Sequence, residues 1–204
     1  MSKSKIVTRD KSKKREMITE GAIKAFMEHG YKNTSMDIIA MHAGVSKKTI
    51  YNHFKSKENV ILTIISAYLD GKSILKEIKY DNSKSLEEQL KKFANAELYL
   101  INTPEKLGLA RLLTLTFIED RDLALRIVMN FEPNRLRFTN WLKEAVDDKK
   151  LEVNNLENAA SIFYSLIEGG ITYPVLFQPK LNIERSQNMI DEAITTFLCR
   201  YRQK

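Results

Sequence analysis

The sequence predicts an all-α protein with a small N-terminal helical domain followed by a larger helical body. Apolar residues recur at three- and four-residue steps along most of the chain, whereas no segment alternates apolar and polar residues as a half-buried strand does. Only seven Gly and four Pro occur among 204 residues, which favours long helices with short connections. A hydrophobic content of 43% is sufficient for a substantial core.

The first helix is expected to follow a disordered basic arm that ends near residue 9. Its apolar face at helical spacing is formed by Ile18, Ala22, Ala25 and Phe26. Gly30 is expected to end this helix, because glycine readily adopts the left-handed backbone conformation of a helix C-terminus.

Two short helices separated by a tight turn are predicted over residues 35–54. The first runs from about Met36 to Ala43, and Gly44 supplies the positive φ that a sharp helix exit requires. Ser46 then caps the second helix. This arrangement is the helix-turn-helix, whose second helix lies in the major groove of DNA.

The second of these helices is expected to present a polar face to DNA. Ile50 and Phe54, four residues apart, anchor it to the core and leave the polar side chains outside. The predicted DNA-binding residues on this face are Lys47, Lys48, Thr49, Tyr51, Asn52 and His53.

Positive charge is concentrated in the same part of the chain. Residues 1–57 contain 13 Lys and Arg but 5 Asp and Glu, whereas the other 147 residues contain 20 and 21. Lys and Arg neutralise phosphates and supply most nonspecific DNA affinity. A Lys-rich terminus alone is equally consistent with a solvated arm, but the excess continues through Lys47, Lys48, Lys55 and Lys57.

The remaining chain is predicted to be helical throughout. Ser56 caps a linking helix that extends to about Ile78, and the polar residues 79–85 form a loop. Further helices are expected over residues 86–101, 105–118, 121–130, 133–148, 156–176 and 183–201.

Several short motifs coincide at fixed spacing between residue 13 and about residue 62. They are Gly30-Tyr31, Thr34-Ser35, Ile39-Ala40, Ala43-Gly44-Val45-Ser46, Thr49-Ile50-Tyr51, His53-Phe54 and Ser56-Lys57-Glu58. Together they resemble the TetR family of bacterial transcriptional regulators. The rest of the chain matches that family only in being helical and of suitable length.

The resemblance implies a symmetric homodimer, each subunit having a three-helix DNA-binding head and a helical body that encloses a ligand cavity. It also implies a backbone phosphate contact for Lys57 and DNA contacts for the polar face described above. Many members have a small residue where this chain has Lys48, so base preference at that point is open. We therefore assign residues 1–57 to the DNA-binding domain with its basic arm and residues 58–204 to a ligand-binding and dimerisation domain.

The last two helices have wide apolar faces, and the resemblance implies that they pair across the two-fold axis as a four-helix bundle. The residues predicted to form this dimer interface are Ala159, Phe163, Leu166, Ile190, Ile194 and Phe197.

The body also contains candidates for an effector site. They are Phe93, Tyr99, Arg111, Phe117, Trp141 and Tyr173. For each aromatic residue, ordinary core packing is the alternative. A buried Arg111 must be paired, either with Glu97 or Glu168 or with an acidic ligand, although arginine also extends from helix edges into solvent.

The sequence gives no indication of catalysis, a cofactor or a metal site. His29, His42 and His53 share no ligand spacing with cysteines or carboxylates, and no nucleophile elbow or phosphate loop is present. Cys199 is expected to pack as a small apolar residue. Without a signal peptide or an apolar run of membrane-spanning length, the chain is expected to be cytoplasmic and not to bind membranes.

These observations predict a ligand-responsive transcriptional repressor that is released from a palindromic double-stranded DNA operator by a small, mainly apolar molecule. An activator and a ligand-independent DNA-binding protein are the alternatives in the same class. A helical enzyme with a basic surface is the alternative in another class.

Overall fold

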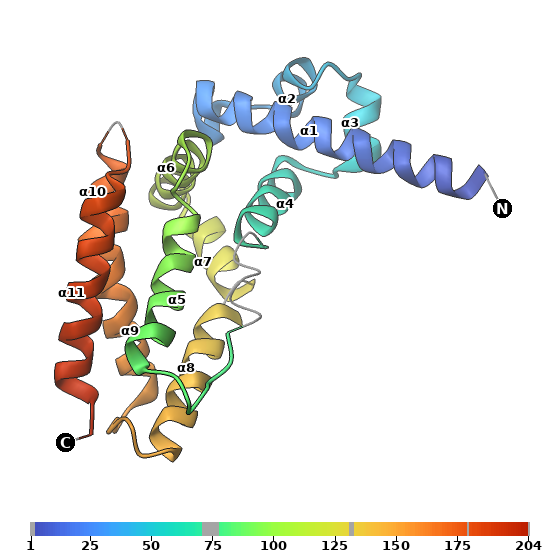
Figure 1. Ribbon diagram of the computed structural model, residues 1–204. Helices are drawn as coiled ribbons and strands as arrows, with labels where there is room; N and C mark the ends of the chain where they lie inside the picture. Colours follow the sequence, from blue (N-terminus) through green and yellow to red (C-terminus); the bar gives the residue numbers. More distant parts are fainter. Residues whose placement is uncertain (1–2, 71–77, 131–132, 179, 204) are drawn as a thin grey trace. The chain divides into compact units, whose positions relative to one another are not determined.

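The computed structural model describes residues 3–70, 78–130, 133–178 and 180–203, and it is helical along most of their length (Figure 1). The helices are α1 (Lys3–Asn33), α2 (Met36–His42), α3 (Lys47–His53), α4 (Lys57–Asp70), α5 (Leu86–Tyr99), α6 (Pro104–Glu119), α7 (Arg121–Asn130), α8 (Pro133–Asp147), α9 (Leu156–Ile167), α10 (Tyr173–Leu176) and α11 (Ile183–Tyr201). Within these residues the only extended pairing is an isolated bridge between Leu151 and Arg202. The all-α prediction is confirmed.

Most of the predicted helix boundaries lie within two residues of the observed ones. The exceptions concern α1, α4 and α9. The predicted linking helix to about Ile78 is described as α4 only to Asp70; residues 71–77 lie outside the described residues, and Ile78 is not helical. Helix α1 begins at Lys3, so the prediction of a disordered arm up to residue 9 is wrong. The first twenty residues contain neither Gly nor Pro and are rich in Lys, Arg and Met, which favour helix. The predicted helix over residues 156–176 is interrupted by a π-helical turn, Glu168–Thr172.

Packing divides the chain into two compact units. The head unit contains residues Met1–Tyr68 and Arg111–Ile127, and the body unit contains Leu69–Ala110 and Val128–Lys204. Helix α4 and the second part of α6 therefore pack with the N-terminal helices, beyond the predicted boundary at residue 57. The functional division into residues 1–57 and 58–204 stays a prediction.

The head unit is built on the apolar face of α1. All four residues predicted for this face are completely buried, and so are Ile39 of α2 and Ile50 of α3. The backbone turns where the sequence indicates, with φ of +76° at Gly30 and +63° at Gly44.

Gly21 allows two helices of the head to approach closely. A Cβ atom at this position would lie 2.5 Å from the backbone nitrogen of Ala43, so α1 crosses the end of α2 in backbone contact.

The body unit is a bundle in which α5, α8, α9 and α11 run side by side (Figure 1). Its centre is a cluster of aromatic rings whose neighbouring centroids lie 4.6–6.4 Å apart. The cluster consists of Phe93, Phe138, Trp141, Phe163, Tyr164, Phe197 and Tyr201. Such ring pairs add to the stabilisation from buried apolar area.

The cluster changes the interpretation of the predicted dimer interface. Ala159, Phe163, Ile190, Ile194 and Phe197 are all buried within the protomer, at 3% exposure or less. Their side chains face the core formed by α5, α8, α9 and α11 of the same chain, so they offer almost no surface to a second copy. This burial argues against direct contact of these five side chains with a second copy, and their part in the interface stays a prediction. Of the predicted set, Leu166 is half-exposed.

Cys199 is exposed on α11, so the prediction that it packs as a small apolar residue is wrong.

Among the described residues, no helix is both long enough and apolar enough to cross a bilayer.

Candidate nucleic-acid interface

Side-chain caps fix the two short helices of the head. The Ser35 hydroxyl accepts a hydrogen bond from the Ile38 backbone N–H at 3.2 Å, and the Ser46 hydroxyl accepts one from Thr49 at 3.1 Å. Each cap satisfies an N–H group that has no partner within its own helix. Between them, the backbone N–H of Val45 donates to the Ala40 carbonyl at 3.0 Å and closes the turn. The result is a helix-turn-helix.

Helix α3 presents the polar face that the sequence predicts. Ile50 and Phe54 are buried, whereas Lys48, Tyr51 and Asn52 are exposed. Thr49 and His53 lie half-buried at the edges of this face, and the Thr49 hydroxyl shares a hydrogen bond with the Ser46 hydroxyl at 2.8 Å. The predicted division between buried and exposed residues is confirmed, and their contact with DNA stays a prediction.

Lys47 forms an ion pair with an acidic residue of α2, a contact that the sequence did not predict. Its ammonium nitrogen lies 2.9 Å from a carboxylate oxygen of Asp37 on α2. This hydrogen bond and the charge of Asp37 raise the pKa of Lys47. Because the pair is exposed, it contributes little stability, and a DNA phosphate must compete with Asp37 for the ammonium group.

Lys57 also has partners within the protein. Its ammonium group donates to the backbone carbonyls of Tyr31 at 2.7 Å and Lys32 at 3.1 Å, and it lies 4.4 Å from the centroid of the Tyr31 ring. Partial burial lowers the pKa of Lys57. Lys57 thus binds carbonyls in the last turn of α1, after the kink at Gly30, a structural role that the sequence did not indicate. Its phosphate contact stays a prediction.

Arg15 contacts the C-terminal end of α3. Its guanidinium lies 4.4 Å from the centroid of the Phe54 ring and donates to the His53 carbonyl at 3.3 Å and the Thr63 hydroxyl at 3.0 Å. Three helices, α1, α3 and α4, therefore meet at one side chain. This contact helps to hold the polar face of α3 in a fixed orientation.

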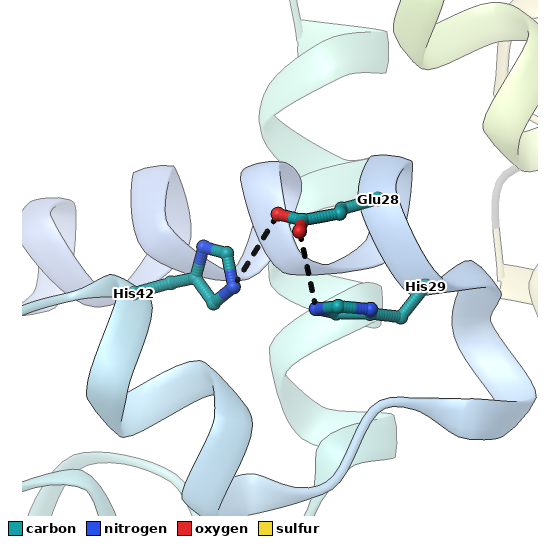
Figure 2. Close-up of side chains that lie close together, drawn as sticks. All are labelled: Glu28, His29 and His42. Carbon is teal, nitrogen blue, oxygen red and sulfur yellow. Dashed lines mark ion pairs between the residues drawn. The ribbon is translucent and has the colours of Figure 1, made fainter.

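Two of the three histidines converge, contrary to the sequence prediction. Figure 2 shows the Glu28 carboxylate of α1 between the rings of His29 and His42, the latter from α2. The carboxylate oxygens lie 3.8 Å from Nε2 of His29 and 3.7 Å from Nε2 of His42. The spacing along the chain gives no signal for this cluster, because the fold of α2 onto α1 creates it.

The body unit contains a groove of about 1330 Å³. Tyr99 lines it, as do polar residues from α5, α8 and the segment before α5. Gln89 is buried in its wall. Its side-chain oxygen accepts from the indole N–H of Trp141 at 3.1 Å and from the Asp81 backbone N–H at 2.9 Å, and its amide nitrogen donates to the carbonyls of Asp81 and Lys84. Gln89 thereby fixes the segment that forms one side of the groove.

The predicted effector residues do not form one site within either unit. Phe93 and Trp141 belong to the aromatic cluster and are almost completely buried, which agrees with the alternative of core packing. Tyr173 is exposed on α10. Arg111 and Phe117 are half-buried in the head unit, whereas the proposed partners Glu97 and Glu168 belong to the body unit. A ligand contact for Arg111 stays a prediction.

Two family models match the chain. Residues 18–64 match the model for bacterial regulatory proteins of the tetR family. Residues 88–203 match the model for the C-terminal domain of AefR-like transcriptional repressors. The second match covers more than half of the chain and most of the body unit.

Individual relatives agree with these models. The HTH-type regulator SrpR of Pseudomonas putida is 22% identical over 185 residues, which cover 90% of this chain and 83% of SrpR. The HTH-type regulator YhgD of Bacillus subtilis is 38% identical over 77 residues, and that match spans only 37% of YhgD.

Solved structures match over nearly the whole chain. A TetR family transcriptional regulator from Pseudomonas syringae pv. tomato superposes with a TM-score of 0.79 and 28% identity, and the match covers 93% of this chain and 97% of that one. The flavonoid-responsive regulator FrrA superposes with a TM-score of 0.72 and 27% identity, covering 95% and 99%.

Proposed function

Because this chain belongs to the TetR family of DNA-binding bacterial transcriptional regulators, we propose that it is a repressor that binds a palindromic operator as a homodimer. A small, mainly apolar molecule bound in the body releases it from the operator. The observation that carries the proposal is the exposed polar face of α3, supported from beneath by the buried side chains of Ile50 and Phe54. A helix presented in this way fits the major groove of B-DNA.

Tyr51 is the central test of the DNA contact. Its side chain is 49% exposed, and its ring and hydroxyl can meet a thymine methyl or a phosphate. We expect Tyr51→Ala to weaken specific operator binding by roughly ten- to a hundredfold, the loss typical of one base contact. Retardation of an operator selected from a random DNA pool measures the affinity, and an enriched palindrome in that pool gives the symmetry of the complex.

Met27→Ala is a matched control, because Met27 is a large exposed residue of α1 outside the helix-turn-helix. It should bind the operator as the parent protein does. Circular dichroism should show unchanged helicity for both variants. If Tyr51→Ala binds as tightly as Met27→Ala, α3 does not contact the operator as proposed.

The groove of the body unit is the proposed effector site. It combines the aromatic ring of Tyr99 and the apolar side chains of Leu98 and Leu181 with side-chain amides and with charged side chains, among them Lys92 and Glu144. The aromatic and apolar part of this lining suits a flat, mainly apolar molecule whose hydrogen-bonding groups meet the polar side chains. The similarity to FrrA, which is described as flavonoid-responsive, makes flavonoids the first class to screen.

An effector releases DNA only if it binds more tightly to the conformation that cannot engage the operator. In a dimer, the two copies of α3 must reach successive major grooves, which are ~34 Å apart. A bound molecule that favours another spacing lowers operator affinity. An effector that binds both conformations equally tightly leaves the equilibrium between them unchanged.

The effector screen uses thermal shift followed by operator release. Flavonoids, fatty acids and aromatic acids are tested for compounds that both raise the melting temperature and dissociate the DNA complex. Tyr99→Ala should then weaken binding of an active compound by roughly tenfold through the loss of a stacking contact. Tyr173→Ala, at an exposed tyrosine that does not line the groove, should not.

Two results would contradict this proposal. If Tyr173→Ala weakens binding and Tyr99→Ala does not, the effector site lies near α10. If no compound releases the operator, the effector-controlled repressor is ruled out in favour of a ligand-independent repressor.

The homodimer is proposed to form through the outer side of α9 and α10. Ile162, Tyr173 and Phe177 are exposed at 45%, 54% and 88%, and Leu166 is half-exposed. Ile162 and Leu166 lie four residues apart and share a face of α9. Tyr173 begins α10 and Phe177 follows its end, both beyond the π-helical turn, and these four side chains form the proposed apolar stripe. Pairing two copies along this apolar stripe would bury it.

A further inference from the structure

Three metal-ligating side chains lie together in the head, outside the polar face of α3. Glu28 and His29 are at the end of the straight part of α1, and His42 is the last residue of α2. The ligand atoms of all three lie within 4.8 Å of one another (Figure 2). Neither the DNA-binding proposal nor the effector proposal uses this cluster.

The distances within the cluster are longer than those of hydrogen bonds. Oε1 of Glu28 is 3.8 Å from Nε2 of His29, and Oε2 is 3.7 Å from Nε2 of His42. One carboxylate therefore faces two imidazoles, with each oxygen directed to a different ring. A tetrahedral zinc ion with ligands at ~2.0–2.1 Å holds its donor atoms ~3.3–3.5 Å apart. Small side-chain rotations bring the three donors to that separation.

The exposure of the three residues suits an ion that enters from solvent. The Glu28 side chain is 62% exposed, that of His29 is 35% exposed and that of His42 is 17% exposed. Water can thus complete the coordination that three protein ligands leave open. His42 has the least exposed side chain of the three proposed ligands and lies deepest in the site.

The donor set also indicates which ion fits. Two imidazole nitrogens and one carboxylate oxygen favour Zn²⁺, Co²⁺ or Ni²⁺ over Mg²⁺ and Ca²⁺, which prefer oxygen ligands alone. We propose that Glu28, His29 and His42 bind one divalent transition-metal ion of the zinc type, which links the end of α1 to the end of α2.

The link has a structural consequence. Helix α2 has seven residues and depends on tertiary contacts for its stability, because helices of this length are marginal in isolation. An ion held by both helices binds the folded head more tightly than the unfolded chain, so it stabilises the head. The inference does not depend on the effector or on repression.

The test is titration of untagged, chelator-treated protein with Zn²⁺, and with Co²⁺ to report coordination by its visible absorption. We expect one ion per chain and a melting temperature that rises by several degrees with zinc. Glu28→Gln and His42→Gln should each weaken zinc binding by at least about a hundredfold, since each removes a direct ligand. Glu28 is exposed, so its variant should fold normally.

Two matched controls use the other potential zinc ligands. His53→Gln removes the histidine of α3, and Cys199→Ser removes the exposed cysteine of α11, and both should bind zinc as the parent does. The proposal is overturned if the parent binds no zinc at 100-fold molar excess. It is equally overturned if a folded Glu28→Gln variant binds as well as the parent, or if His53→Gln or Cys199→Ser abolishes binding.

Discussion

Gly21→Ala is expected to abolish operator binding and to destabilise the head by at least about 3 kcal/mol, at or above the upper end of ordinary overpacking. The added methyl group would lie 2.5–2.7 Å from the backbone nitrogen, Cα and Cβ of Ala43. These atoms cannot rotate away as a flexible side chain can. Helix α1 must therefore move away from the end of α2, and this movement displaces the turn that leads into α3.

Alanine variants of two other glycines serve as controls, because they distinguish this steric clash from the other consequences of replacing a glycine. Gly169→Ala adds a methyl group with no atom within 4 Å, so the body unit should keep its stability. At Gly44 the space is also open, but φ is +63°, and alanine there should cost only about 1–2 kcal/mol of backbone strain. Chemical denaturation and operator retardation measure all three variants. If Gly21→Ala is no more damaging than Gly44→Ala, the backbone contact is not needed.

Local chemistry allowed much of the head to be predicted from the sequence. The cap at Ser46, the turn glycine Gly44 and the spacing of Ile50 and Phe54 act within a few residues of one another. The exposed face of α3 follows from this spacing alone. Such signals are readable because neighbours in the sequence determine them.

Contacts between distant segments could not be predicted in the same way. Gly21 contacts Ala43, and His42 approaches Glu28, only because α2 folds back on α1. Lys57 reaches the carbonyl of Tyr31 because the start of α4 packs against the end of α1. No periodic pattern in the sequence indicates that these residues are in contact. The groove of the body unit has the same origin, since Gln89 joins residues 81–84 to Trp141 on α8.

The dimer interface shows a further limit of sequence patterns. The apolar repeats of α9 and α11 were correctly recognised, but periodicity does not say whether another helix of the same chain or a second copy covers an apolar face. In the structure, Phe163 and Phe197 are in the protomer core, with ring centroids 5.4 Å apart. Exposed apolar side chains are present elsewhere, at Ile162 of α9 and at Phe177, which follows α10.

A charged substitution should have different effects in the protomer core and on the exposed apolar surface of α9 and α10. Phe197 is 1% exposed, and Phe197→Glu removes a core aromatic ring and buries a carboxylate. Truncation of a core phenylalanine alone costs about 3–5 kcal/mol, and an unpaired buried charge adds to this cost. Since total stability is typically about 5–15 kcal/mol, we expect the body unit to lose its cooperative thermal transition.

Ile162→Glu combined with Phe177→Glu is expected to give folded monomers instead. Both side chains are exposed in the protomer, so the charges remain hydrated there but oppose each other across a two-fold interface. Leu136→Glu is the matched control, because Leu136 is 61% exposed on α8 and should leave the dimer intact. Sedimentation and circular dichroism distinguish the three variants. A folded, monomeric Phe197→Glu protein would restore the core faces as the interface, whereas a dimeric Ile162→Glu/Phe177→Glu protein would place the interface away from α9 and α10.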